Sequence, residues 1–224
     1  MTPAVKNPAM KFNVLLFFIL LSASTLSQTH YKFNTVRKYR VERLGFNYER
    51  VIYTNSENPN YNLTVDLFKD LRAILVDRDR KITVTYKLTD NPKPVEKFDL
   101  VYMWTEPYTT NVSRDYKPDY RKVAEDSLSG TFIIDNYKSP KKKKLVGHTE
   151  IKMLKPYKLI DGSTYFNSIA MRKMGPLPVE GIIESYKLSS IKGKIYMQSK
   201  LLLSSPLDFA ITLENAQLKT TNFK

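Results

Sequence analysis

Cysteine is absent from this chain, which excludes disulfides, thiolate metal sites and thiol catalysis. Small secreted domains often depend on disulfides, but a chain of about 200 residues can bury a core without them. Only 7 glycines and 12 prolines occur among the 224 residues, which excludes a collagen-like or linker-like chain. Histidine occurs twice, at His30 and His148, so the sequence offers little material for histidine-based catalysis.

Long hydrophobic runs are also missing. The apolar run at 14–21 is far shorter than the roughly 20 residues that a membrane-spanning helix needs. A lysine precedes this run and small residues follow it, which is the pattern of a signal peptide. We expect the signal peptide to end at Ser27, or at Ser24, with Met10 as an alternative start. The remaining chain, 28–224, is then a single secreted, extracellular domain, and its net charge falls from +14 to +12 because two lysines are removed.

Motifs of nucleophilic, metal-dependent and nucleotide-dependent enzymes are absent as well. The chain contains no Gly-x-Ser-x-Gly, His-Glu-x-x-His, Gly-x-Gly-x-x-Gly or P-loop pattern. The sequence therefore predicts a non-enzymatic protein with no catalytic residues, no cofactor and no metal site. A secreted chain does not meet chromatin, so we expect no nucleic-acid partner for its basic segments.

Alternation of apolar and polar residues is the main pattern that the chain does contain. In Ile195–Leu203, isoleucine, methionine and leucine alternate with tyrosine, glutamine and lysine, and Leu207–Leu213 repeats the pattern after Ser204-Ser205-Pro206. This periodicity is typical of strands with one buried face, here joined by a turn. Further strands are expected at 38–44, 47–53, 61–68, 81–88, 98–104, 130–137, 145–153, 164–171 and 179–188.

Two segments leave alternatives open. Leucines and isoleucines at 63–75 fit a helical stripe as well as a strand, so a short helix near 65–77 stays an alternative. The polar segment 105–127 is expected to be irregular, either as a long loop or as a boundary between two halves. About ten strands joined by short turns predict an all-β or mainly β fold, built as an antiparallel sandwich, a barrel or a strongly curved sheet.

Basic residues concentrate in two places. Lys141, Lys142, Lys143 and Lys144 follow a proline between two expected strands, which indicates a solvated hairpin tip that could also touch an anionic surface. The segment 36–51 mixes tyrosines and phenylalanine with basic side chains, including Arg37, Lys38 and Arg40. The sequence there fits a β-hairpin whose solvent-exposed face is basic, or a surface that binds sulfated glycans or anionic lipid headgroups.

Two functions from different classes follow. The many aromatic residues, the seven methionines and the alternating strands could line a cavity for a small hydrophobic ligand or lipid, although the same residues could fill a solid core. The alternative is an interaction or effector protein whose basic surfaces bind glycans, an anionic membrane or a protein partner. Behind a signal peptide, the triplets at Asn62 and Asn111 predict N-glycosylation.

Two segments, GTFIIDNY at 130–137 and LDFAITLENAQL at 207–218, are similar to parts of secreted insect lipid carriers of the takeout and juvenile-hormone-binding type. The resemblance implies a secreted carrier of an apolar ligand. This chain lacks that family's N-terminal cysteine pair and its long amphipathic helix, so no residue roles are transferred.

Overall fold

The computed structural model describes residues 28–68, 71–88, 99–108, 119–137, 144–163 and 177–219. The expected signal peptide, the expected strand at 164–171, Asn111 and Lys141–Lys143 lie outside these residues. These described residues form eleven strands: β1 (Gln28–Arg43), β2 (Phe46–Thr54), β3 (Tyr61–Leu67), β4 (Arg72–Asp77), β5 (Ile82–Leu88), β6 (Leu100–Pro107), β7 (Asp119–Glu125), β8 (Ser129–Tyr137), β9 (Leu145–Ser163), β10 (Leu177–Ser190) and β11 (Ile195–Glu214). One 3-10 turn, η2 (Asn215–Leu218), follows the last strand.

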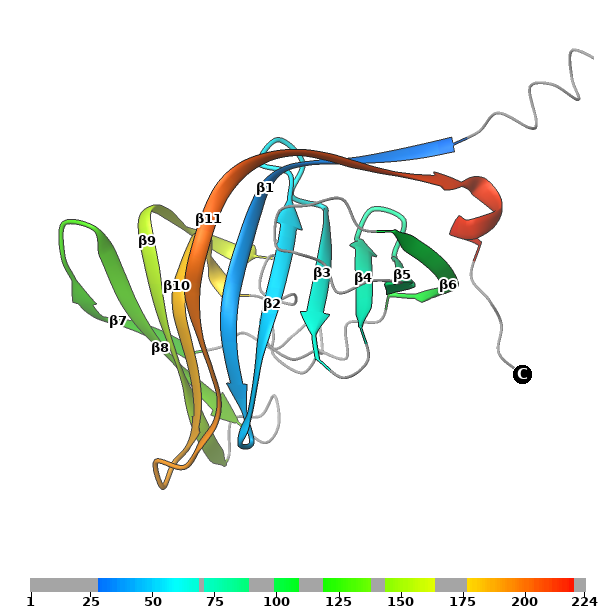
Figure 1. The fold of residues 1–224 in the computed structure, drawn as a ribbon. Helices are drawn as coiled ribbons and strands as arrows, with labels where there is room; N and C mark the ends of the chain where they lie inside the picture. The colour runs from blue at the N-terminus through cyan, green and yellow to red at the C-terminus, as the bar shows by residue number, and fades with distance from the viewer. Residues whose placement is uncertain are drawn as a thin grey trace, which may run out of the picture.

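All eleven strands belong to one antiparallel sheet, with the order β6-β5-β4-β3-β2-β1-β11-β10-β9-β8-β7. The sheet is strongly curved and does not close, as Figure 1 shows, so β6 and β7 form its two edges. The prediction of an all-β, antiparallel, curved architecture is confirmed. The first and last strands of the chain meet in the middle of the sheet, where β1 pairs with β11.

The buried face of the sheet changes side at its centre. Val51 and Tyr53 of β2 belong to one apolar cluster, while Ile52 between them belongs to a second. Successive residues of a strand point to opposite faces, so the two clusters lie on opposite faces of the sheet. The first cluster covers β2–β6, the first half of β1 and the second half of β11. The second covers β8–β10, the second half of β1, the first half of β11 and part of β2.

The outer halves of β1 and β11 arch over the β3–β6 side of the sheet (Figure 1). Before Thr35, β1 no longer pairs with β2 and continues alongside β11 alone. A hydrogen bond connects this arch to β4, because the Tyr31 hydroxyl of β1 donates to the buried carboxylate of Asp77 at 2.6 Å. Burial, followed by this hydrogen bond, raises the pKa of Tyr31. A second tie joins the Thr105 hydroxyl of β6 to the carbonyl oxygen of Gln217.

Three local predictions were wrong, and they concern the segments 65–77, 105–127 and 204–206. The alternative of a short helix near 65–77 is replaced by the β3–β4 hairpin, in which Leu63 lies opposite Leu75. Ile74 and Leu75 are consecutive in β4 and point to opposite faces of the sheet, so only part of the apolar stripe is buried together. The segment 105–127, expected to be irregular, contains the end of β6 and the whole of β7.

The predicted turn at Ser204-Ser205-Pro206 does not form, and β11 continues through it as one long strand. On one side of β11, Pro206 lies opposite Thr35 of β1. On the other side, the pairing of β11 with β10 ends at Lys200, so within the described residues no strand pairs with Pro206 there. A proline is tolerated in a strand where the missing amide donor would face away from a ladder. A break in the β1–β11 register between Phe33 and Thr35 lies next to this position.

Candidate functional site

A row of charged side chains crosses the polar face of the central strands. Arg40 of β1 lies directly opposite Lys200 of β11, and Lys200 lies opposite Ser185 of β10. Ser185 in turn lies opposite Lys152 of β9. Directly opposed residues of antiparallel strands point to the same face, so this row presents its side chains together.

A second row runs parallel to the first, two residues further along each strand. Glu42 lies opposite Gln198, Gln198 opposite Lys187, and Lys187 opposite Glu150. Between the two rows is a groove of about 290 Å³. The residues that line it are Arg40, Glu42, Glu150, Ser185, Tyr186, Lys187, Gln198, Ser199 and Lys200.

Two of the groove cations face each other without a carboxylate between them. Within the described part of the chain, no ion pair or hydrogen bond is made by the guanidinium of Arg40 or the ammonium of Lys200. The carboxylate of Glu42 interacts with a different residue, because it accepts a 2.6 Å hydrogen bond from the Gln198 amide. Like charges placed directly opposite each other destabilise a sheet. An anionic group bound between the two cations would remove that repulsion.

The basic residues singled out in the sequence end up in different places. Arg40 lines the groove, whereas Lys38 on the same face is paired with Glu49 at 2.5 Å. Arg37 points to the opposite face, where its Nε is buried and has no hydrogen-bond partner in the described structure. Lys144 is exposed just before β9. Its place outside β8 and β9 agrees with the predicted hairpin tip.

Lys187 and Lys200 were not predicted as functional residues. The alternation of β11 already places Lys200 on its polar face. What the sequence does not reveal is that β1 and β11, about 160 residues apart, pair in the register that sets Lys200 against Arg40.

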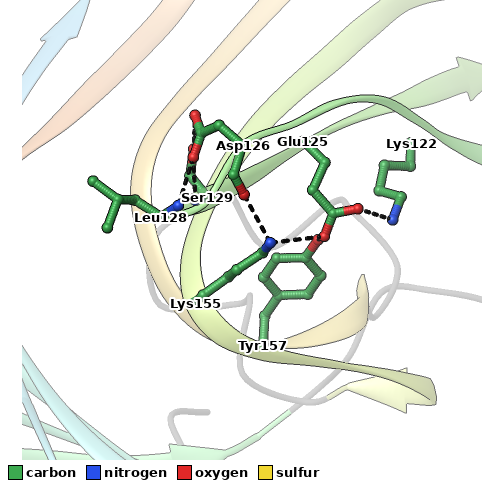
Figure 2. A network of polar contacts seen from close by, with 7 residues as sticks. All are labelled: Lys122, Glu125, Asp126, Leu128, Ser129, Lys155 and Tyr157. Atoms are coloured by element: carbon green, nitrogen blue, oxygen red, sulfur yellow. Dashed lines mark hydrogen bonds and ion pairs between the residues drawn. The ribbon is translucent and has the colours of Figure 1, made fainter.

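A separate polar network surrounds the β7–β8 turn (Figure 2). The carboxylate of Glu125 accepts hydrogen bonds from Lys122 and from the hydroxyl of Tyr157, at 2.5 and 2.7 Å, and forms an ion pair with Lys155 at 3.2 Å. These contacts, led by the hydrogen bond from Lys122, lower the pKa of Glu125 to about 2. A carboxylate held this firmly in its charged form is a poor proton donor or acceptor near neutral pH. The network therefore fastens the β7–β8 hairpin to β9.

His148 is engaged in a similar cross-strand contact. Its Nδ1 lies 2.8 Å from Asp135, which also forms an ion pair with Arg121 at 3.0 Å. Among the described residues, no group of three or more acidic or histidine side chains could hold a metal ion. No helix in the same residues is long and apolar enough to cross a bilayer.

The predicted glycosylation site at Asn62 lies in a buried position on β3. Its side-chain nitrogen donates to the Thr64 hydroxyl at 3.2 Å, and its oxygen accepts from Arg78 at 2.9 Å. A sugar on that nitrogen would have to displace these contacts, so the folded position of Asn62 disfavours the modification. Glycosylation of Asn62 and Asn111 stays a prediction.

The predicted apolar ligand also stays a prediction. In the described residues, the buried apolar side chains pack against one another in the two clusters of the sheet. Aromatic rings fill much of the first cluster, where Phe33 contacts Tyr53, Tyr61 and Phe209 at centroid distances of 5.6 to 6.3 Å. Charged and polar residues line the groove described above, and three of them are cations that could bind an anionic group.

No protein-family model matches the chain, and no curated protein matches it either. The resemblance to the insect lipid carriers therefore has no support from these comparisons. A solved structure of the Pseudomonas aeruginosa MucA/MucB complex is similar at 13% identity, with a TM-score of 0.38 over 93% of this chain. The match covers 61% of that chain, so this chain spans about three fifths of its length. A TM-score this low does not establish a shared fold.

Proposed function

We propose that the protein is a non-enzymatic, extracellular binding protein whose central groove recognises an anionic group on an extended ligand. The observation that carries this proposal is the opposition of Arg40 and Lys200 across β1 and β11. Neighbouring strands lie about 4.8 Å apart, so the two cations can contact one sulfate, carboxylate or phosphate together. Ser185 lies next in the row and supplies a hydroxyl for a further hydrogen bond.

The groove favours an extended ligand over a single small ion. Lys187 adds a cation in the second row, next to Arg40 and Lys200 of the first, whereas Lys152 at the end of the first row is paired with Glu184 at 2.9 Å. A sulfated or carboxylated polysaccharide repeats its charges along its length and can engage several of these positions at once. Glu150 lies opposite Lys187, so the net positive charge of the groove is small. A ligand must then place its anionic groups near the individual cations, which favours specific binding over non-specific attraction of any polyanion.

Retention on immobilised heparin tests the proposal, because heparin is an extended sulfated polyanion. The variants Arg40→Gln and Lys200→Gln should elute at clearly lower salt than the unmodified protein. The matched control is Lys38→Gln, which removes one charge from the same face of β1 at a position already paired with Glu49. Elution of the control close to the unmodified protein would support the groove.

Equal losses for all three variants would mean that net charge alone drives retention, and would contradict the proposal. The same conclusion follows if the unmodified protein is not retained at physiological salt. Competition with chondroitin sulfate and with inorganic sulfate then distinguishes recognition of a polymer from recognition of a single anion.

A further inference from the structure

Six large apolar side chains are exposed at one end of the sheet. The β1–β2 and β10–β11 hairpins project side by side at the lower edge of Figure 1, and the backbone amide of Leu44 donates to the carbonyl oxygen of Tyr196 at 3.2 Å. The exposed residues on these hairpins and on the neighbouring end of β3 are Leu44, Phe46, Phe68, Ile191, Ile195 and Tyr196. We call Arg43–Phe46 and Ile191–Tyr196, which carry five of these six side chains, the hairpin end.

The turn at Leu44 is unusual in two respects. Leu44 and Gly45 have φ values of 49° and 84°, and they connect Arg43 and Phe46, which pair directly. A two-residue turn with both φ values positive normally carries asparagine or glycine at its first position. Leucine is disfavoured in this conformation, and here its side chain is also 64% exposed. The fold therefore keeps an apolar side chain at a position where it stabilises neither the turn nor a core.

Basic residues accompany the apolar ones. Lys192 and Lys194 occupy the β10–β11 turn, and both are exposed. The sequence of the hairpin end, Arg-Leu-Gly-Phe and Ile-Lys-Gly-Lys-Ile-Tyr, contains no acidic residue. Apolar side chains next to lysines match the two layers of a bilayer surface, because the apolar groups enter the acyl boundary while the lysines reach the headgroups.

We propose that the hairpin end docks the protein onto an anionic lipid surface. Its apolar side chains sit on separate projecting turns, and a fluid bilayer can accommodate such turns without a preformed pocket for each one. A folded protein partner would need a surface complementary in shape to these projecting side chains. The charge complementarity with anionic headgroups selects the lipid surface over an acidic soluble ligand, which would leave the apolar residues in water.

Sedimentation with phosphatidylserine-containing vesicles tests the proposal, with pure phosphatidylcholine vesicles as the comparison. The unmodified protein should bind the anionic vesicles more tightly, and added salt should weaken the binding. Each lysine near an anionic surface strengthens binding about fivefold, so replacing both Lys192 and Lys194 by serine should weaken it about thirtyfold. The charge-matched control replaces Lys32 and Lys81 by serine, and both lie away from the hairpin end.

The variant Leu44→Asn separates binding from folding. Asparagine suits the turn better than leucine, so the urea midpoint should rise or stay unchanged while vesicle binding falls about tenfold or more. The matched control is Leu128→Asn, because Leu128 is 74% exposed in the β7–β8 turn at the opposite end of the strands. This control should bind vesicles like the unmodified protein.

Three results would overturn the proposal. The unmodified protein could fail to sediment with anionic vesicles, or the variants at the hairpin end could bind as well as their controls. A concentration-dependent dimer in light scattering, abolished by Leu44→Asn, would assign the hairpin end to a second copy of the chain instead of a membrane.

Discussion

The opposition of Arg40 and Lys200 predicts that removing one of the two cations stabilises the protein. At a separation of about 6 Å in water, two unit charges repel by about 0.7 kcal/mol. Physiological salt, with a Debye length of about 8 Å, reduces this to about 0.3 kcal/mol. We therefore expect Arg40→Gln to raise the free energy of unfolding by about 0.3–0.7 kcal/mol, with the larger value at low salt.

Urea unfolding followed by the fluorescence of the single tryptophan, Trp104, measures this effect. The midpoint should shift at constant m, because the folded and unfolded surfaces hardly change. Lys200→Gln should give a similar gain, and the double variant should gain less than the two together, because either substitution already removes the shared repulsion. Lys38→Gln, which breaks the ion pair with Glu49, should not gain stability.

Two results would contradict this expectation: a lower midpoint for Arg40→Gln at low salt, or strict additivity of the two substitutions. Either result would mean that the cations do not repel each other in the folded protein. The proposal of an anion-binding groove would then lose its main support, because a bound anion would no longer relieve a repulsion between Arg40 and Lys200.

Further predictions concern single contacts. Tyr31→Phe removes the hydroxyl that donates to the buried carboxylate of Asp77 and should cost about 1.5–3 kcal/mol of unfolding free energy, measured by urea unfolding. The pKa of Glu125 is lowered from 4.5 to about 2, so its contribution to stability is present above pH 4.5 and is lost as the pH falls towards 2; Glu125→Gln should flatten that part of a pH–stability curve. Gly147→Ala should lower the thermal midpoint, because the added methyl group would overlap the carbonyl oxygen of Ser189.

Much of the sheet could be predicted from the sequence because alternation is a local signal. The strands around Val84 and Ile211 keep their large apolar residues on one parity, and the structure confirms them. Phe132 and Ile134 share a parity in the same way, with Ile133 on the other face. The β7 strand was missed because all of its residues are exposed, so its sequence has no buried face to reveal it. The long β11 was divided in two because proline usually ends a strand, and the missing neighbour that permits it is a property of the whole sheet.

The candidate groove could be predicted only in part, for the same reason. Arg40 was singled out because it lies in a segment dense in basic and aromatic residues. Its partner Lys200 comes from a distant segment, and a shift of one residue in the β1–β11 register would place Lys200 on the other face. Arg37 and Lys38 share the local sequence signal of Arg40, but the opposite strand face and the ion pair with Glu49 separate them from the groove.

The change of buried face at β2 has a consequence for how the protein opens. Val51 and Tyr53 hold one half of the sheet, and Ile52 holds the other, so a small group of central residues anchors two separate cores. Each half can then lose its packing while the other remains closed. In hydrogen exchange, we expect two partial openings of different free energy, with the amides of the shared strands β1 and β2 exchanging only when both halves have opened.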